Sequence, residues 1–529
     1  MTAQRQPAVI DKVIAGRSDR VVVVGAGIGA MAAALELAVA GMEVLVLERA
    51  RHPGGKMRRV WVGDTPMDAG PTVFTMRWVF DELFAQAGVR LEDQIPLQRA
   101  HVLARHAWDE SARLDLFADV KQSCEAIGDF AGAGAANGYR TFCARARQIY
   151  DTLEKPFLRG TRPTPLSLVG RAGLRGLPAL MGISPFATLW KELGNYFQDP
   201  RLRQLFGRYA TYCGSSPWLA PATLMLVAHV EQEGVWLVEG GMHRLAQATE
   251  SLCLSRGARF RYGAHVEEIV CRDGRATGVR LAGGELVKAG AVIFNGDVAA
   301  LGQGLLGSAA AAAQPARPGA SRSLSAITIN LLAPTSGFPL MRHNVFFSRD
   351  YAAEFDDILQ RDRLPAEPTV YVCAQDRGDD ADAFTPGGQE RLLCIVNAPP
   401  SGDTRTFTQG EIESCQAKAF GQLARCGLQV NWAKDASVTT TPNQFGQMFP
   451  GTGGALYGQA SHGWAASFSR PGSRTRLPGL YLAGGSTHPG PGVPMAALSG
   501  RLAAASLMED RASTRRSHPV ATHGGTSTR

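Results

Sequence analysis

Glycine-rich segments that follow short apolar runs are the first places in this chain where chemistry is expected. The run Val21–Val24 is followed by Gly25-Ala26-Gly27-Ile28-Gly29-Ala30. Gly25 permits a tight turn, Gly27 allows the backbone to approach a pyrophosphate, and Ala30 lets a helix pack close to the strand. The free N–H groups at the start of that helix would face the phosphates. The spacing therefore predicts a dinucleotide site.

An acidic residue follows the second apolar run at the distance that such a site requires. Val44–Leu47 predicts a second buried strand, and Glu48 comes directly after it. Its carboxylate is placed to accept hydrogen bonds from a ribose diol and would repel a 2′-phosphate. The pattern favours a dinucleotide without that phosphate and argues against NADP.

A second diglycine extends the first motif. Gly54 and Gly55 precede Lys56. This doublet resembles the extended FAD fingerprint of the amine oxidase and carotenoid desaturase superfamily, and the resemblance implies that these residues contact FAD. The family often has Arg and then Ser or Thr where this chain has Lys56, followed by Arg58-Arg59.

The C-terminal part holds the longest match to that family. The apolar run Leu480–Ala483 leads into a Gly/Pro-rich loop that contains His488, and a helix is predicted to begin near Pro494. The start of such a helix can stabilise negative charge on a flavin ring. The segment resembles the signature of bacterial phytoene desaturases, which implies FAD contacts for Gly484, Gly485 and Val493. His488 is a candidate general base, although a hydrogen bond that shapes the loop is the simpler interpretation.

Further matches extend the resemblance over nearly the whole chain and imply the fold. The stretch around Val266 resembles the strand whose valine contacts adenine through its backbone. The expected class is α/β, with a Rossmann-type FAD-binding domain of the GR2 or amine oxidase type and an α+β substrate domain. The FAD domain is expected to be discontinuous, at 20–95, 230–305 and 475–510, with the substrate domain at 96–229 and 306–474. Residues 1–19 are expected to form a loose leader and 511–529 a disordered tail.

Four stretches resemble, within this family, the desaturases of 1-hydroxycarotenoids: 68–77, 205–212, 234–243 and 369–377. The implied activity introduces a C-3,4 double bond by transferring a hydride to the flavin while the neighbouring carbon loses a proton. Glu239, His488 and Arg208 are the candidate catalytic residues, and Glu239 is the preferred polar side chain of the pocket. Each of them also has an ordinary structural interpretation.

The segment 157–197 combines basic, apolar and aromatic residues. That mixture suits contact with a membrane surface, from which a lipid-dissolved carotenoid would enter. An amphipathic pair of helices packed on the core explains the pattern equally well. The segment is therefore a candidate membrane contact.

Composition excludes several other classes of protein. The net charge of +8 over 529 residues is modest, and we find no zinc-finger spacing and no basic helix, so no nucleic-acid partner is expected. The 9 cysteines form no CxxC pair, and no metal site is expected. No secretory signal or spanning helix is visible, so we expect a cytoplasmic protein that associates peripherally with the inner membrane.

Alternatives within the same fold remain open from the sequence. They are a phytoene or neurosporene desaturase, a flavin-dependent non-redox carotenoid isomerase, and a non-catalytic flavoprotein that binds carotenoid. Amine oxidation is less favoured because no motif for covalent flavin attachment is present. The residues name neither the electron acceptor nor the oligomeric state.

Overall fold

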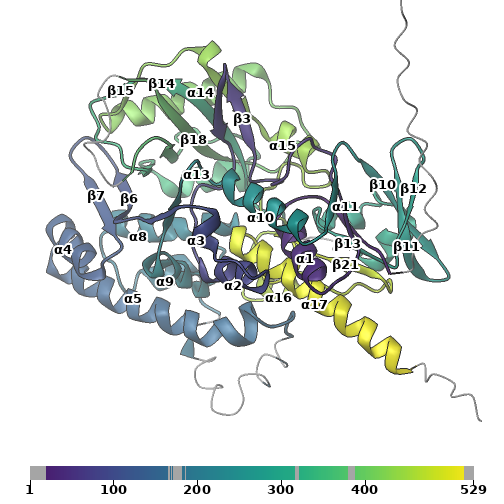
Figure 1. The fold of residues 1–529 in the computed structure, drawn as a ribbon. Coiled ribbons are helices and arrows are strands. Elements are labelled where there is room, and N and C mark those ends of the chain that lie inside the picture. The colour runs from purple at the N-terminus through teal and green to yellow at the C-terminus, as the bar shows by residue number, and fades with distance from the viewer. Residues whose placement is uncertain are drawn as a thin grey trace, which may run out of the picture.

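The computed structural model describes residues 19–164, 167, 170, 182–184, 186–315, 321–378 and 388–517. Its helices and strands form two layered units that face each other across the middle of the molecule (Figure 1). One unit is built on a parallel sheet and the other on a larger mixed sheet.

The parallel sheet has 5 strands in the order β21-β13-β1-β2-β9. Its strands come from separate parts of the chain: β1 (Val21–Val24), β2 (Val44–Leu47), β9 (Arg259–Arg261), β13 (Ala291–Phe294) and β21 (Leu480–Leu482). The four residues of β1 are completely buried or nearly so, as continuous valine runs in parallel sheets are. The predicted strands at 21–24 and 44–47 are confirmed.

Helices cover one face of this sheet and a small antiparallel sheet covers the other. The helices are α1 (Ile28–Val39), α10 (His243–Ser255) and α17 (Val493–Ser517), which share one apolar core with Val21 and Val23. On the opposite face, β10 (Val266–Arg272), β11 (Arg275–Leu281) and β12 (Leu286–Lys288) pack against Val22 and Val24. Figure 1 shows α17 (yellow) lying beside α1 (purple).

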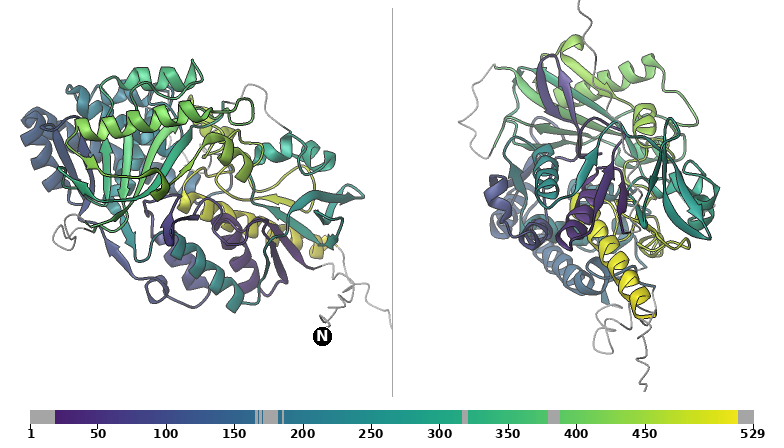
Figure 2. Two further views of the ribbon diagram at one scale, coloured as in Figure 1. Left: turned by 90° about the horizontal axis from the view of Figure 1, so that it is seen from above. Right: turned by 45° about the vertical axis from the view of Figure 1, so that its right-hand side comes forward.

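The mixed sheet has 7 strands in the order β20-β14-β18-β17-β16-β6-β7. All neighbouring pairs are antiparallel except β16 with β6. The bounds are β6 (Val102–Ala107), β7 (Arg113–Phe117), β14 (Ser325–Ala333), β16 (His343–Phe346), β17 (Val370–Ala374), β18 (Glu390–Ala398) and β20 (Ser437–Thr440). Helix α14 (Gln409–Arg425) covers one face and shares a core with alternate residues of β14, β17 and β18 (Figure 2). The other alternate residues therefore face the parallel-sheet unit.

Helices on the flank of the mixed sheet complete this unit. They pack through a core of aromatic side chains that includes Tyr139, Phe142, Phe197 and Phe206. The helices are α4 (Val120–Ala131), α5 (Ala133–Leu153), the π-helix η1 (Glu154–Leu158), α7 (Leu189–Leu193), α8 (Pro200–Gly207), the 3-10 helices η2 (Arg208–Cys213) and η3 (Ala222–Met225), and α9 (Leu226–Glu233).

Short elements join these layers. The strand pairs are β3 (Arg59–Val62) with β4 (Thr65–Asp68), β5 (Leu97–Arg99) with β8 (Trp236–Val238), and β15 (Thr335–Ser336) with β19 (Gln429–Val430). The remaining helices are α2 (Trp78–Gln86), α3 (Leu91–Gln94), α11 (Val298–Gly302), α12 (Ser308–Ala313), α13 (Tyr351–Leu359), η5 (Lys434–Ala436), α15 (Pro442–Met448) and α16 (Ala466–Ser469).

The C-terminal helix corrects one expectation. The predicted tail began at 511, but α17 continues to Ser517. Charged contacts stabilise this polar end: the guanidinium of Arg474 donates hydrogen bonds to Glu509 and Asp510, and Tyr481 donates to Asp510. A polar composition therefore did not mean an absence of structure here. Residues 518–529 and 1–18 lie outside the described residues.

Candidate active site

A cavity of about 1000 Å³ runs between the two units. Its wall at one end is made by the glycine loops that follow β1 and β2, and by the loop before α17. Toward the other end the wall consists of the inner face of the mixed sheet, α9 and the end of α5. This volume is at the upper end of the usual range for ligand pockets.

The two glycine loops meet directly at this cavity. Gly27 forms a parallel bridge with Gly54, and the N–H of Gly54 donates a hydrogen bond to the carbonyl of Ala26 at 2.8 Å. A Cβ on Gly55 would lie 3.3 Å from the Cα of Gly27, and Gly25 has a φ of 96°, which favours glycine. All four glycines line the cavity. The predicted loops thus come together and expose backbone to a ligand.

Glu48 fixes this arrangement from the end of β2. One carboxylate oxygen accepts a hydrogen bond from the N–H of Ala26 at 2.6 Å, and the other accepts from the N–H of Ala50 at 2.8 Å. The residue is 9% exposed and lines the cavity, as Val266 also does. Ala30 lies in the first turn of α1, completely buried and outside the cavity lining, where a small side chain permits close packing.

The start of α1 fits a diphosphate. No side chain caps this helix and no acidic residue lies in its first turn. Its first residues, Ile28 and Gly29, line the cavity, so the free N–H groups of this turn are available to a ligand. Beside it, Asn295 follows β13, and its buried Oδ1 has no hydrogen-bond partner among the described residues. A Cβ on Gly27 would lie 2.7 Å from Asn295 Nδ2. The loop therefore leaves no room for a protein side chain at position 27, and its main chain is exposed to a ligand.

The predicted flavin end has the cationic surroundings that a reduced flavin ring requires. Gly484, Gly485 and Val493 line the cavity where α17 begins, with no acidic residue in its first turn. Lys56 lines the same part, and its Nζ donates a hydrogen bond to the carbonyl of Leu456 at 2.5 Å. Burial lowers the pKa of this ammonium, while the Asp297 carboxylate acts in the opposite direction.

Arg470 is a second cation at this end. It is 3% exposed, and its guanidinium donates hydrogen bonds to the carbonyls of Gln459 at 2.6 Å and Gly485 at 3.2 Å. Burial lowers its pKa, and both Cys213 and Asp297 oppose that shift. The guanidinium thus holds the Gly485 loop and places positive charge at the cavity wall.

His488 shapes the wall of the cavity and is not part of its lining. The side chain is 1% exposed, and its Nε2–H lies 2.9 Å from the carbonyl oxygen of Phe157 and 3.0 Å from that of Gly160. Such a nitrogen is a donor to main-chain oxygens. The geometry favours the structural interpretation of His488.

Arg208 lies at the cavity wall with a group of buried hydroxyls. Its guanidinium donates a hydrogen bond of 3.4 Å to the hydroxyl of Tyr212. Tyr212 and Tyr209 in turn donate to the two carboxylate oxygens of Glu231, at 2.7 and 2.8 Å. Burial raises the pKa of Glu231, although the hydrogen bonds from the two tyrosines act in the opposite direction. Arg208 is thus part of the site that the sequence predicted.

Glu239 corrects the prediction. It is exposed in the turn that follows β8 and does not line the cavity. The turn points away because Gly240 and Gly241, with φ of 76° and 90°, reverse the chain toward α10. Glu231, eight positions earlier and on the buried face of α9, does line the cavity.

Sequence reasoning also missed Asn295, Arg470 and Tyr371. Asn295 had a usable signal, since it follows a buried strand whose carboxyl end must lie beside that of β1. Arg470 and Tyr371 come from segments whose approach to the glycine loops no local pattern predicts.

Two exposed aromatic residues of the cavity lining, Phe186 and Trp464, lie at the opening of the cavity, and we call them the aromatic rim. The two rings lie 5.4 Å apart in an edge-to-face arrangement, and both residues line the cavity. Phe186 is 67% exposed and Trp464 is 48% exposed. Phe157, Leu158, Ile183 and Phe468 continue the wall inward.

The structure describes part of the candidate membrane segment. Within 157–197, residues 165, 166, 168, 169, 171–181 and 185 lie outside the described residues. Across the part of the chain that the structure describes, no helix has both the length and the apolar character needed to cross a membrane.

Comparisons with known proteins show the family of the chain. The family described as "Flavin containing amine oxidoreductase" matches residues 31–508. The chain is 57% identical to the hydroxyneurosporene desaturase of Rubrivivax gelatinosus, over 97% of this chain and 98% of the relative. It is 44% identical to the enzyme of the same name from Cereibacter sphaeroides, over 94% and 99%. It is 34% identical to the zeta-carotene-forming phytoene desaturase of Myxococcus xanthus, over 92% and 94%.

Solved structures share the fold. An oxidoreductase from Methanosarcina mazei superposes with a TM-score of 0.60 at 16% identity, covering 93% of this chain and 100% of that one. A variant of putrescine oxidase superposes with a TM-score of 0.57 at 15% identity, covering 93% and 99%. The predicted fold class and FAD as the cofactor are confirmed. The chain belongs to the flavin-containing amine oxidoreductase family, in the branch that contains the bacterial carotenoid desaturases.

Proposed function

We propose that this protein desaturates carotenoids and introduces the C-3,4 double bond into 1-hydroxycarotenoids such as 1-hydroxyneurosporene. One observation carries this proposal: a single continuous cavity joins the dinucleotide cradle at Gly25–Ala30 to a largely apolar wall that opens at the aromatic rim. A long hydrocarbon could thus reach the cofactor without crossing water. The hydroxyneurosporene desaturases that share 57% and 44% of the residues support the choice of substrate.

The protein's own contribution is orientation and exclusion of water. FAD supplies a hydride acceptor when it is bound. The cavity is lined by apolar side chains of the helices and of the mixed sheet, namely Leu224, Val227, Val230 and Ile395. Such a wall restricts the orientation of a bound polyene. Glu231 is the carboxylate near this apolar part, and burial raises its pKa, which suits a group that accepts a proton. Arg208 cannot act as a base because a guanidinium stays protonated.

The test is a comparison of substrates with the purified, FAD-loaded protein. We expect 1-hydroxyneurosporene to gain one double bond at C-3,4, detected by chromatography and mass spectrometry. Phytoene incubated beside it should react far more slowly. Failure to convert any carotenoid while flavin is bound would overturn the proposal.

A second candidate is desaturation of phytoene or neurosporene. The relative from Myxococcus xanthus, named as a zeta-carotene-forming phytoene desaturase, covers nearly the whole chain at 34% identity and favours this possibility. The same assay separates the two, since faster conversion of the unhydroxylated carotene would replace the first proposal with the second.

We infer further that the protein associates peripherally with the cytoplasmic membrane through the aromatic rim. Phe186 and Trp464 are exposed at the opening of the cavity, where a substrate dissolved in lipid must enter. Leu219, which is 44% exposed, adjoins them because its carbonyl accepts a hydrogen bond from the N–H of Gly463. Aromatic rings of this kind favour the membrane interface.

Liposome flotation tests this inference. The double variant Phe186→Asp, Trp464→Asp should lose binding to vesicles of phosphatidylglycerol and phosphatidylethanolamine. Trp61→Asp is the matched control, because Trp61 is 63% exposed on β3 and does not line the cavity. Equal binding of the double variant and wild type would rule out the rim as the contact.

A further inference from the structure

Arg208 lies in the cavity wall beside two tyrosine rings. Its guanidinium lies 5.4 Å from the ring centre of Tyr212 and 5.3 Å from that of Tyr371. Over the residues that the structure describes, its hydrogen bond is the long one to Tyr212, at 3.4 Å, and it forms no ion pair. Burial acts against this charge, yet the nearby Tyr212 hydroxyl keeps the pKa of the guanidinium above its usual value. Most donors of this cation are therefore available to a ligand.

A second buried donor lies near Arg208. Tyr351 is 6% exposed and lines the cavity, and its hydroxyl has no hydrogen-bond partner among the described residues. The ring is held in place by an edge-to-face contact with Phe355 at 5.2 Å and a tilted contact with Trp218 at 5.7 Å. Arg208 and Tyr351 lie close enough to influence each other electrostatically. Arg208 thus offers N–H donors at the cavity wall, and the Tyr351 hydroxyl lies enclosed in the same wall without an acceptor among the described residues.

The surrounding wall sets the orientation of Arg208. Tyr212 donates its proton to Glu231 at 2.7 Å, so its oxygen must accept from the guanidinium. Tyr212 therefore fixes the position of Arg208 while accepting only one of the hydrogen bonds that the guanidinium can donate. A purely hydrocarbon ligand would leave the remaining donors of Arg208 and Tyr351 buried without an acceptor, which is unfavourable.

This polar group is connected to the cofactor loops. The hydroxyl of Tyr371, which lies beneath Arg208, is 2.6 Å from Oγ1 of Thr72. Two residues earlier, Gly70 packs against the carbonyl of Lys56 so closely that no Cβ would fit. In a 1-hydroxycarotenoid the hydroxyl is separated by few bonds from carbons 3 and 4. A group that holds the hydroxyl here therefore also fixes the carbons that react.

We propose that Arg208 and Tyr351 bind the hydroxyl group of a hydroxylated polyene and so set the preference of this enzyme for a hydroxylated over a hydrocarbon substrate. The inference rests on the proposed desaturase function and names the residues that select its substrate class. Arg208 donates to the hydroxyl oxygen, and Tyr351 donates to it or accepts its proton. Rejection of a substrate that lacks the hydroxyl follows from the unpaired donors it would leave.

The experiment measures kcat/KM for 1-hydroxyneurosporene and for neurosporene with wild type, Arg208→Met, Arg208→Lys and Tyr351→Phe. We expect Arg208→Met to lower kcat/KM for the hydroxylated substrate about 10- to 100-fold more than for the hydrocarbon. Tyr351→Phe removes a single oxygen, cannot disturb folding much, and should change the same ratio by about 5-fold. For Arg208→Lys, the ratio of kcat/KM for the hydroxylated substrate to that for the hydrocarbon should lie between the ratios of wild type and Arg208→Met. Lysine keeps the positive charge but loses the paired N–H donors of the guanidinium.

Arg113→Met is the matched control. Arg113 also lies over an aromatic ring, Phe338, at 5.3 Å, but it is exposed and outside the cavity lining. In Arg113→Met, the ratio of kcat/KM for 1-hydroxyneurosporene to that for neurosporene should equal the wild-type ratio. Equal loss on both substrates in Arg208→Met and an unchanged ratio in Tyr351→Phe would overturn this inference while leaving the desaturase function intact. Wild type that converts neither carotenoid would instead overturn the proposed function itself.

Discussion

The carboxylate of Glu48 accepts a hydrogen bond of 2.6 Å from the backbone N–H of Ala26, so the end of β2 holds the first glycine loop in its shape. Replacing Glu48 with Ala removes this bond and the expected acceptor for the ribose. We predict a Kd for FAD that rises about 10- to 100-fold, measured by titrating the apoprotein with FAD and following flavin fluorescence. Glu43→Ala, which removes a carboxylate that pairs with Arg20 outside the cavity lining, should leave the Kd unchanged. Equal affinities in Glu48→Ala and wild type would contradict this role.

The crossing of α1 and α17 depends on two glycines. A Cβ on Gly500 would lie 2.0 Å from the carbonyl oxygen of Gly29, which is main chain and cannot move aside. Gly500→Ala should therefore lower the free energy of unfolding by about 2 kcal/mol or more and weaken flavin binding. Gly421→Ala is the control, since Gly421 lies within α14 with open space around it. That variant should be slightly more stable, by about 0.5–1 kcal/mol. A Gly500→Ala protein as stable as wild type would show that the helices do not cross this closely.

His488 should tolerate a change that keeps a donor. Its Nε2–H faces the carbonyl oxygens of Phe157 and Gly160 and the ring lies outside the cavity lining. His488→Gln is expected to retain kcat within about tenfold of wild type, with an unchanged pH profile, whereas losing a general base costs about 10²–10⁴-fold. Steady-state rates from pH 6 to 9, roughly the range in which a histidine base would titrate, provide the measurement. A loss of the larger size with flavin still bound would restore His488 as a base.

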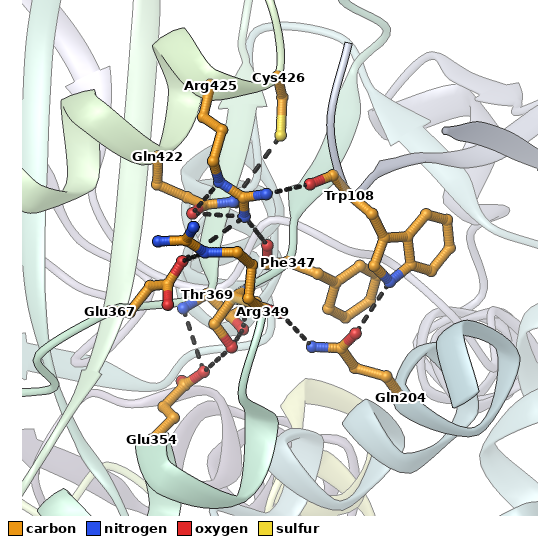
Figure 3. Close-up of polar contacts among 11 residues, drawn as sticks. Trp108, Gln204, Phe347, Arg349, Glu354, Glu367, Thr369, Gln422, Arg425 and Cys426 are labelled. Carbon is orange, nitrogen blue, oxygen red and sulfur yellow. Dashed lines mark hydrogen bonds and ion pairs between the residues drawn. The ribbon is translucent and has the colours of Figure 1, made fainter. Parts of the chain in front are cut away.

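Glu354 should make stability depend on pH. It is 1% exposed, and burial raises its pKa to about 6, against the opposing hydrogen bonds from Thr369, Asn397 and Ser348. Figure 3 shows Glu354 beside Thr369, whose N–H donates to it at 3.1 Å. An acid whose pKa is raised in the folded state binds its proton more tightly there. The folded state is therefore favoured at low pH, and this advantage is lost as pH rises from the unfolded value to about 6.

Glu354→Gln removes that titration. Relative to wild type, the free energy of unfolding of the variant should rise by about 2 kcal/mol as pH increases through this window and then stay level. Urea denaturation at a series of pH values gives the two curves. Glu110→Gln, at an exposed carboxylate, should run parallel to wild type. A Glu354→Gln curve that also runs parallel would show that Glu354 ionises normally.

The cofactor half of the site could be predicted because its geometry is local. Val21–Val24, Gly25–Ala30 and Glu48 belong to one strand, turn, helix and strand, and the spacing alone brings them together. Lys56 was implied by the resemblance to the FAD fingerprint, and the structure places it at the cavity because the second glycine loop bridges back to Gly27. Here sequence distance and spatial distance are nearly the same.

The substrate half could be predicted only in part because its residues come from distant segments. Arg208 from η2, Glu231 from α9 and Tyr371 from β17 meet at one wall. The sequence favoured Glu239 as the polar side chain of the pocket, but the turn after β8 carries Glu239 to the surface. The burial of Glu231 depends on which face of α9 packs inward, and a helix this short gives too weak a periodicity to predict that face.

The most direct test of the account mixes the FAD-loaded protein with 1-hydroxyneurosporene in the absence of oxygen. The shared cavity predicts that the absorbance of oxidised flavin disappears in a single exponential phase, while one equivalent of a carotenoid with one more double bond is formed. Flavin that stays oxidised with 1-hydroxyneurosporene, neurosporene and phytoene alike would contradict the claim that one cavity brings cofactor and polyene together for desaturation.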